Sequence, residues 1–237
     1  MRHIKKITLV FLIFFVFSFY IIQEEWIQQN DLRDGETNAS NGSITRIPSA
    51  YSLDVPFTSQ APYANWGLPY QEACEEASLL MAWHYFRGET NMPKKKIDSE
   101  IQKIVAWEIE YFGYYKHTDA TQTAKMAERY LGLKAKLVYD VSVHSIKREL
   151  LAGNIVVIPT AGRLLGNPYY TGEGPVYHML VIRGWDRKGF ITNDPGTRRG
   201  ENYRFPETTI MNAIHDWNEK DIYAGQRVLI SISKGKN

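Results

Sequence analysis

Apolar and polar positions divide the chain into three regions. A run that is apolar apart from Thr8, Ser18 and the Tyr20 hydroxyl spans Ile7–Ile22. The stretch Asn30–Ser49 is rich in Asn, Ser, Gly, Thr and Asp, the composition of a solvated linker. From about Tyr51 the apolar positions recur with helix and strand periods, and no internal repeat is visible. We therefore expect a cytoplasmic tip with a signal anchor or uncleaved signal at 1–26, a flexible linker at 27–50 and one folded domain at 51–237.

Helical patterns come first within the domain. Three helices are expected at Glu72–Arg87, Ser99–Phe112 and Thr121–Leu131, and each is followed by a glycine suited to a C-terminal cap. Ser99 and Gln102 have the spacing of a capping box, which predicts the start of the second helix.

Strand patterns dominate after Gly132, and a short strand-like segment precedes the helices at Leu53–Thr58. Two further helices fit Ser142–Leu151 and Thr208–Trp217. The later strands are expected at Lys134–Tyr139, Ile155–Pro159, Tyr177–Gly184, Phe190–Asn193 and Gln226–Ile232. Helices first and a sheet afterwards predict an α+β fold.

The N-terminal apolar run predicts attachment to a membrane. At about 1.5 Å per residue it spans roughly 24 Å, less than the roughly 30 Å hydrocarbon core, so a cleaved signal peptide and a secreted domain stay open. However, no small-x-small cleavage site follows, the basic residues Arg2, Lys5 and Lys6 precede the run, and Glu24 and Glu25 follow it. By the positive-inside rule we expect a single-pass anchor in the cell membrane with an extracytoplasmic C-terminal domain.

Composition narrows the classes of function. The chain has 28 basic and 26 acidic residues, for a net charge of +2, and their even spread predicts no nucleic-acid-binding face. The single cysteine excludes an intramolecular disulfide and any Cys-based zinc site. No metal-binding or phosphate-binding motif is present, so we expect neither a metal nor a cofactor.

Cys74 lies in QEACEEASLLMAWHYF, at the first turn of an expected helix. There, free backbone N–H groups and the helix dipole favour an anion and lower the pKa of a thiol. Glu75 and Glu76 act in the opposite direction, because like charge beside a thiol raises its pKa. A lone cysteine is more often a small buried core residue, so its interpretation depends on its partners.

His178 and Asp194 are the partners that the sequence offers. His178 opens the run HMLVIRGWD and Asp194 closes GFITNDPG, with a turn expected at Asp186–Gly189. A hairpin folded there places both side chains on one face of the sheet. His178 then serves as general base and acid, and Asp194 orients the imidazole. Gln60 or Gln71 is expected to supply an oxyanion donor together with a backbone N–H.

The segment Gly162–Tyr177, just before His178, contains four glycines, two prolines and three tyrosines. We expect it to form a loop that overhangs the site and contacts substrate. The other histidines, His117 among them, lie in contexts that compete poorly for the role of base.

Four segments in a fixed order resemble one peptidase family. The four segments are VPFTSQ, ACEEASLLMA, GPVYHMLVIRGWD and NDPG. They are similar to segments of the bacteriocin-processing (double-glycine leader) cysteine peptidases. They are most similar to the stand-alone relatives of these enzymes, the "like" branch of cysteine-peptidase family thirty-nine. The resemblance covers roughly Leu53 to Pro195. It implies a papain-like fold, in which a helix carrying Cys packs on an antiparallel sheet carrying His and Asp.

Carried over residue by residue, the resemblance implies that Cys74 is the nucleophile, His178 the base, Asp194 the orienting residue and Gln60 the oxyanion donor. Gln71 stays second choice. The segment between Gln60 and Cys74 is longer than in the transporter-linked peptidases, which could displace the oxyanion donor. Two glutamates also replace the glycine-containing step that often follows the cysteine.

The implied function is extracytoplasmic hydrolysis of peptide or amide bonds through a thioester, with a peptide or protein as substrate. The sequence shows no ATP-binding motor, so removal of double-glycine leaders during export does not follow. Two alternatives stay open: an inactive papain-like module that binds peptide or cell wall, and a peptidoglycan amidase, endopeptidase or amide-forming acyl transferase. Cleavage specificity and oligomeric state are not indicated.

Overall fold

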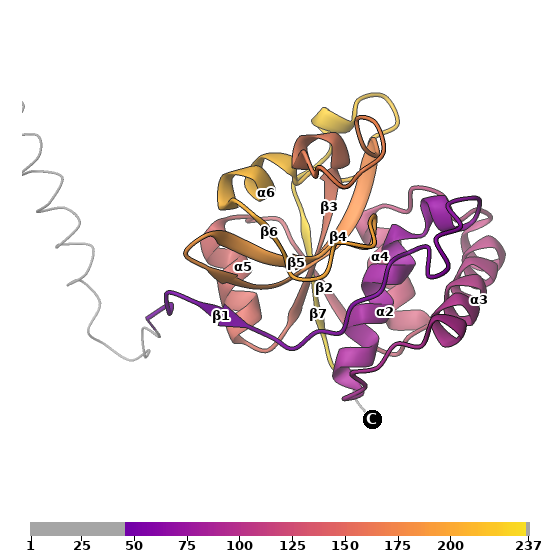
Figure 1. Ribbon diagram of the computed structural model, residues 1–237, viewed down its shortest axis with the longest axis horizontal. Helices are drawn as coiled ribbons and strands as arrows, with labels where there is room; N and C mark the ends of the chain where they lie inside the picture. The colour runs from indigo at the N-terminus through magenta and orange to yellow at the C-terminus, as the bar shows by residue number, and fades with distance from the viewer. Residues whose placement is uncertain (1–45, 236–237) are drawn as a thin grey trace, which may run out of the picture. The chain divides into compact units, whose positions relative to one another are not determined.

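The computed structural model describes residues 46–235 of the chain. The expected anchor at 1–26 and most of the expected linker at 27–50 lie outside this range. Among the described residues, no helix combines the length and the apolar character needed to cross a membrane. Residues from Ile47 onward form one compact unit, whose helices and strands are shown in Figure 1.

Three helices form one part of the unit: α2 (Cys74–Phe86), α3 (Lys94–Phe112) and α4 (Ala120–Arg129). All three expected helices are confirmed. The glycine that follows each has a positive φ of +70°, +84° and +67°, at Gly88, Gly113 and Gly132. Because glycine enters this region without steric cost, these glycines mark the helix ends in the sequence.

The helix starts differ more from expectation than the ends. α3 begins directly after Pro93, so the capping box expected at Ser99 is wrong. Proline suits this position, because the first turn of a helix leaves backbone N–H groups unpaired and proline has none. A capping box exists on α4 instead, where Asp119 accepts from the backbone N–H of Gln122 (2.8 Å) and donates its own N–H to the Gln122 side chain (3.0 Å).

A seven-stranded sheet forms the other part, with strand order β2–β7–β3–β4–β5–β6 and β1 paired to β4. Every pair is antiparallel. The strands are β1 (Tyr51–Ser52), β2 (Lys134–Val138), β3 (Ile155–Ala161), β4 (Tyr177–Asp186), β5 (Gly189–Asn193), β6 (Tyr203–Phe205) and β7 (Leu229–Ser233). The α+β class is confirmed, the three-residue strand β6 was not expected, and the strand expected at Leu53–Thr58 is wrong.

Helices cover the sheet from two sides. Figure 1 shows α2, α3 and α4 on one side and α5 (Val143–Leu151) and α6 (Glu207–Ala213) on the other. Every residue of β3 is accordingly buried, as expected of a strand in the middle of a sheet covered on both faces. The 3₁₀ turns η1 (Tyr70–Glu72), η2 (Gly162–Leu165) and η3 (Ile222–Ala224) complete the fold.

The segment VPFTSQ runs without regular structure beside the end of β5. The side-chain amide of Asn193 donates to the carbonyl of Val55 (3.0 Å), and the backbone N–H of Gln60 donates to the carbonyl of Pro195 (3.0 Å). These long-range bonds, rather than a strand ladder, hold Gln60 at the end of β5.

The hairpin of β4 and β5 contains a β-bulge at Arg183. On the turn side Gly184 faces Ile191, whereas beyond the bulge Ile182 faces Thr192. Because β4 has one extra residue at the bulge, a side chain of β5 beyond the bulge lies on the opposite face from the one that the pairing on the turn side would give it. The turn expected between the strands is confirmed.

Candidate active site

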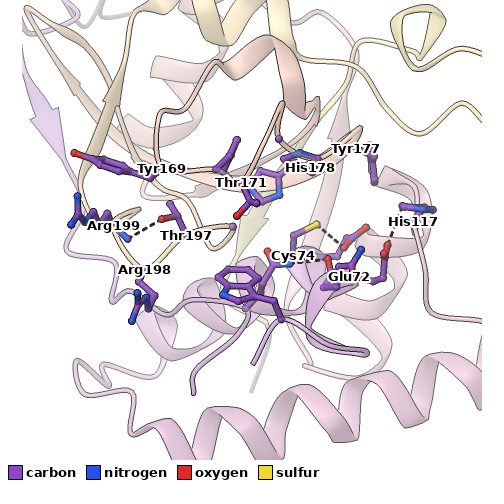
Figure 2. Close-up of a pocket in the computed structure, with 18 residues that line it drawn as sticks. Glu72, Cys74, His117, Tyr169, Thr171, Tyr177, His178, Thr197, Arg198 and Arg199 are labelled. Atoms are coloured by element: carbon purple, nitrogen blue, oxygen red, sulfur yellow. Dashed lines mark hydrogen bonds and ion pairs between the residues drawn. The ribbon is translucent and has the colours of Figure 1, made fainter. Parts of the chain in front are cut away.

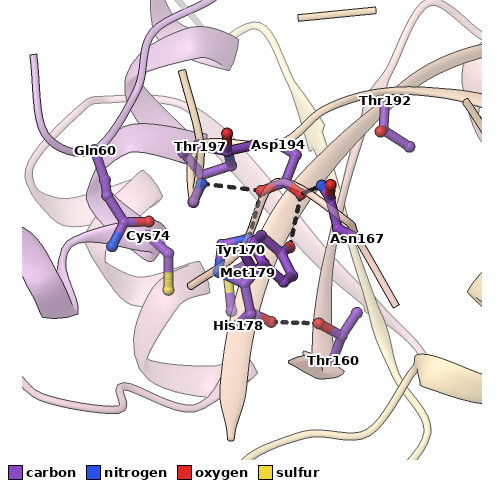
Figure 3. A network of polar contacts seen from close by, with 12 residues as sticks. Gln60, Cys74, Thr160, Asn167, Tyr170, His178, Met179, Thr192, Asp194 and Thr197 are labelled. Atoms are coloured by element: carbon purple, nitrogen blue, oxygen red, sulfur yellow. Dashed lines mark hydrogen bonds and ion pairs between the residues drawn. The ribbon is translucent and has the colours of Figure 1, made fainter. Parts of the chain in front are cut away.

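A cavity of about 940 Å³ lies at the N-terminus of α2 and the start of β4. Gln60, Gln71, Cys74 and His178 all line it, and Figure 2 shows Cys74 and His178 facing the same space. Asp194 lies next to His178 (Figure 3) and is not among the residues that line the cavity. The structure thus brings together all five candidate residues from distant parts of the chain.

Cys74 is the first residue of α2, directly after η1 and Ala73. Its side chain is only 6% exposed. Its Sγ donates a hydrogen bond to Oε2 of Glu75 at 3.0 Å. Within residues 46–235 no hydrogen bond joins the thiol to His178, so the resting thiol proton is directed at a carboxylate.

The surroundings of Cys74 favour the protonated thiol. Burial raises the pKa of Cys74 well above its usual value, the charge and hydrogen bond of Glu75 raise it further, and a backbone hydrogen bond from Met179 lowers it only in part. Glu75 and Glu76 thus act on the thiol pKa in the direction expected from the sequence, although burial is the larger cause. Burial also raises the pKa of Glu75 to about 7.

His178 opens β4, and its imidazole contacts Asp194. Nε2 of His178 and Oδ1 of Asp194 are 2.7 Å apart, and both side chains are buried. Nδ1, on the other side of the ring, is then the nitrogen that can exchange a proton with a nucleophile. The bulge at Arg183 contributes to this contact, because it places Asp194 on the same face of the hairpin as His178.

The carboxylate of Asp194 accepts four hydrogen bonds, the first of them from His178 (Figure 3). Its Oδ1 also accepts from the backbone N–H of Gly196 (2.9 Å), and its Oδ2 accepts from Nδ2 of Asn167 (2.8 Å) and the hydroxyl of Tyr170 (2.6 Å). Burial raises the pKa of Asp194, but the charge of His178 and these hydrogen bonds outweigh it, so the pKa lies below its usual value. A buried anion therefore orients the imidazole.

Gln60 lies beside Cys74 with its amide group engaged (Figure 3). Its Nε2 donates to the backbone carbonyls of Tyr70 (2.9 Å) and Gln71 (3.1 Å). Its Oε1 is buried and has no partner in the described part of the chain. Gln71 is exposed and also lines the cavity. Both N–H groups of Gln60 are thus occupied, so Gln60 can serve as an oxyanion donor only by giving up one of these bonds, and Gln71 stays the alternative.

The sequence matches a known family over most of its length. The model of the Peptidase_C39 like family matches residues 52–222, which contain every candidate residue above. The chain belongs to this family. The resemblance carried by the four segments is thereby confirmed, and the family suggests cysteine peptidase activity.

One solved structure supports the same fold. A crystal structure of a protein described as a C39-like peptidase, from Bacillus anthracis, has a TM-score of 0.51 at 20% identity and covers 80% of this chain and 100% of its own. The peptidase domain of Streptococcus ComA, a bi-functional ABC transporter involved in a quorum sensing pathway, has a TM-score of 0.31 at 13% identity and covers 69% and 93%. No curated protein matches the sequence.

Two residues that the sequence did not single out hold the aspartate of this C39-like domain. Asn167 and Tyr170 belong to the loop that was expected to overhang the site. Tyr170 and Thr171 line the cavity, so the expected position of the loop is confirmed. Nothing local marks Asn167 or Tyr170 as partners of a residue in β5, because only the tertiary fold brings them together.

His117 also lines the cavity, although its loop context predicted no role. Its Nδ1 is 3.5 Å from Oε2 of Glu72, and its ring stacks on Trp217 with centroids 4.2 Å apart. It therefore forms part of the cavity wall on the side of η1.

Two glycines make room for the imidazole. A Cβ on Gly196 would lie 2.8 Å from Cε1 of His178, and a Cβ on Gly162 would lie 2.6 Å from the carbonyl of Pro175 and 3.0 Å from Cβ of His178. Contacts this short require a shift of the ring or the backbone. The glycine of NDPG is thus explained by its distance to His178.

Three buried glutamates lie on α2 and α3: Glu75, Glu76 and Glu108. Burial raises the pKa of Glu108 to about 9 and that of Glu76 well above its usual value, and the charge of Glu75 raises both. A pKa of about 9 keeps Glu108 mainly neutral at pH 7, and burial favours the neutral form of Glu76 as well, which lowers the cost of burying the two side chains. Among residues 46–235, no group of three or more His, Cys, Asp or Glu side chains could hold a metal ion.

Proposed function

We propose that this chain is a cysteine peptidase that cleaves peptide or amide bonds through Cys74, His178 and Asp194. The observation that carries the proposal is the 2.7 Å contact between His178 and the buried Asp194, in a cavity lined by the only cysteine of the chain. Membership of the Peptidase_C39 like family supports the reaction class.

The proposed reaction passes through a thioester. Nδ1 of His178 takes the proton of Cys74 as Sγ attacks the scissile carbonyl, and the same proton then passes to the leaving amine as the C–N bond breaks. Water activated by His178 hydrolyses the thioester, which releases the acid and restores the thiol. Asp194 stabilises the imidazolium in both steps, while the backbone N–H of Cys74 and the amide of Gln60 or Gln71 face the developing oxyanion.

Incubation of the full-length chain with a mixed peptide library, read out by mass spectrometry, tests this proposal. Cys74→Ala and His178→Ala should each reduce cleavage by about a thousandfold or more. His144→Ala changes an exposed histidine on α5 and should cleave as the unmodified protein does. Undiminished cleavage by Cys74→Ala would refute the proposal.

The inactive binding module is a second candidate, because the Cys74 thiol is buried and donates to Glu75. Alkylation of Cys74 by iodoacetamide as a function of pH separates the two. Alkylation that requires His178 indicates that His178 activates the Cys74 thiol. A thiol that reacts only above its ordinary pKa of about 8.5, equally in His178→Ala, and with no peptide or peptidoglycan cut, favours a binding module.

We also propose that the domain acts outside the cytoplasm, tethered to the cell membrane. The apolar run at 7–22 and the basic residues before it support this location. Membrane fractionation followed by protease treatment of intact cells tests it: a domain that stays soluble or protected contradicts the proposal.

A further inference from the structure

The two ends of the cavity carry opposite charges. Figure 2 shows Arg198 and Arg199 on one side of Cys74, and Glu72 and His117 on the other. All four residues line the cavity. A substrate that lies across Cys74 therefore meets guanidinium groups at one end and a carboxylate at the other.

The two guanidinium groups are available for a ligand. Both side chains are exposed, and neither forms an ion pair with any acid among residues 46–235, including the nearby Glu201. By contrast, Arg183 and Arg204 both pair with acids. Unpaired arginines in a cleft retain the forked N–H groups that bind a carboxylate in a bidentate manner.

Arg199 is positioned by an aromatic ring. Its guanidinium carbon lies 5.0 Å from the ring centroid of Tyr169, which also lines the cavity. Stacking of this kind restricts the side chain while the edge of the guanidinium stays open for hydrogen bonds. The cost of ordering the arginine on binding is thereby reduced.

The loop that carries both arginines is fixed to the candidate aspartate. The backbone N–H of Asp194 donates to the carbonyl of Gly200 (3.0 Å), and Oδ1 of Asp194 accepts from the N–H of Gly196 (2.9 Å). Within the loop, the N–H of Arg199 donates to Oγ1 of Thr197 (3.2 Å). These bonds fix the backbone from which both arginine side chains extend relative to Asp194.

We propose that Arg198 and Arg199 form a subsite for a carboxylate of the substrate, on one side of the scissile bond only. The inference rests on the proposed function, because it names the substrate class of that site: a peptide with an acidic side chain, or a free C-terminal carboxylate, at this end of the cleft. Glu72 repels an acid at the opposite end.

The test uses dansyl-labelled peptides in which a single Glu is moved position by position through a neutral sequence, each made with a free or an amidated C-terminus. Cleavage is measured with the full-length chain, and binding with its Cys74→Ala variant by fluorescence anisotropy. We expect Glu on one side of the cut to raise kcat/KM and to lower Kd about tenfold. Glu on the other side should lower kcat/KM and raise Kd. An advantage confined to free-acid peptides identifies the terminus as the ligand.

Three variants assign the preference to the two arginines. The double change Arg198→Gln/Arg199→Gln should abolish it, and Arg198→Glu/Arg199→Glu should reverse it in favour of Lys-containing peptides. Arg187→Gln, an exposed arginine in the turn between β4 and β5, should leave it intact. The proposal is wrong if acidic and neutral peptides have equal kcat/KM and Kd values. It is also wrong if the preference for Glu persists in the double Gln variant. A preference seen in binding without any cleavage supports the subsite and contradicts the peptidase.

Discussion

At Cys74, two groups are candidates for the thiol proton. Glu75 accepts a hydrogen bond from the thiol at 3.0 Å, while His178, held by Asp194, takes the proton in the reaction proposed above. Because Glu75 has its pKa raised to about 7, its charge, and hence its hold on the proton, grows as the pH rises through neutrality. The carboxylate beside Cys74 therefore opposes formation of the thiolate at and above neutral pH.

Replacement of Glu75 by Gln should lower the pKa of Cys74. The amide keeps the size and a hydrogen-bond acceptor, but it removes a charge that raises the thiol pKa. We expect iodoacetamide to alkylate the variant about tenfold faster at pH 8, with a smaller difference at pH 6, where Glu75 is largely neutral. Glu110→Gln, an exposed residue of α3, is the control. An unchanged or raised midpoint of the alkylation profile would contradict the prediction.

The residues that can form the site are recognisable in the sequence, but the protonation state in which they rest is not. Cys74, His178 and Asp194 stand out because each opens or closes a recognisable segment, and the structure brings them together. The direction of the thiol pKa could not be predicted, since it depends mainly on burial, which a sequence does not show. Asn167 and Tyr170 were missed for a related reason: their hydrogen bonds to Asp194 depend on tertiary contacts.

At the scale of the elements, the β4–β5 hairpin was predicted in outline and differs in register. A ladder centred on Asp186 would place His178 directly opposite Asp194. In the structure Asn193 faces Val181, so Asp194 follows opposite Leu180, two residues from His178. Both residues still share a face because this offset is even. The bulge that makes this offset even has no signature that the hydrophobic pattern alone reveals.

Replacement of Gly184 by Ala should separate β1 from β4. A Cβ at this position would lie 2.3 Å from the carbonyl oxygen of Tyr51 and 2.7 Å from Cα of Ser52. We expect a loss of about 1–3 kcal/mol in the free energy of unfolding, since backbone atoms must move apart. Chemical denaturation of the full-length chain measures it.

Gly67→Ala is the matched control, because its new Cβ would approach only the side chain of Asn65, at 3.3 Å. Equal stability of the two variants would show that the pairing of β1 contributes nothing.

At the scale of the whole molecule, the α+β class and the order of its elements followed from the sequence, whereas the arrangement of strands did not. Hydrophobic periods identify a helix or a strand one at a time. The order β2–β7–β3–β4–β5–β6 depends on which edges meet after collapse, and this includes the C-terminal strand β7 inserted between β2 and β3.

The buried glutamates make the stability of the whole fold depend on pH. Glu108 has a folded-state pKa of about 9, above its ordinary value of 4.5, so its favourable contribution is complete below about pH 4.5 and is lost as the pH rises towards 9. Glu108→Gln removes the ionisation, so the free energy of unfolding of the variant should exceed that of the unmodified protein by several kcal/mol at pH 9 and differ little from it at pH 5.

Denaturation with urea at each pH tests this expectation, with Glu110→Gln on the exposed face of the same helix as control. A stability difference that does not change between pH 5 and pH 9 would show that Glu108 does not ionise in this range.

Because of the bulge at Arg183, the contact between His178 and Asp194 depends on the number of residues in each strand of the hairpin. Removal of one residue from the paired part of either strand would turn Asp194 away from His178, whereas removal of two would restore the face but displace the aspartate by about 7 Å along the strand. Insertions and deletions are therefore harmless only in the turn, or when a change in one strand is matched in the other. The candidate site therefore requires the pairing register of this hairpin as well as the identity of its residues.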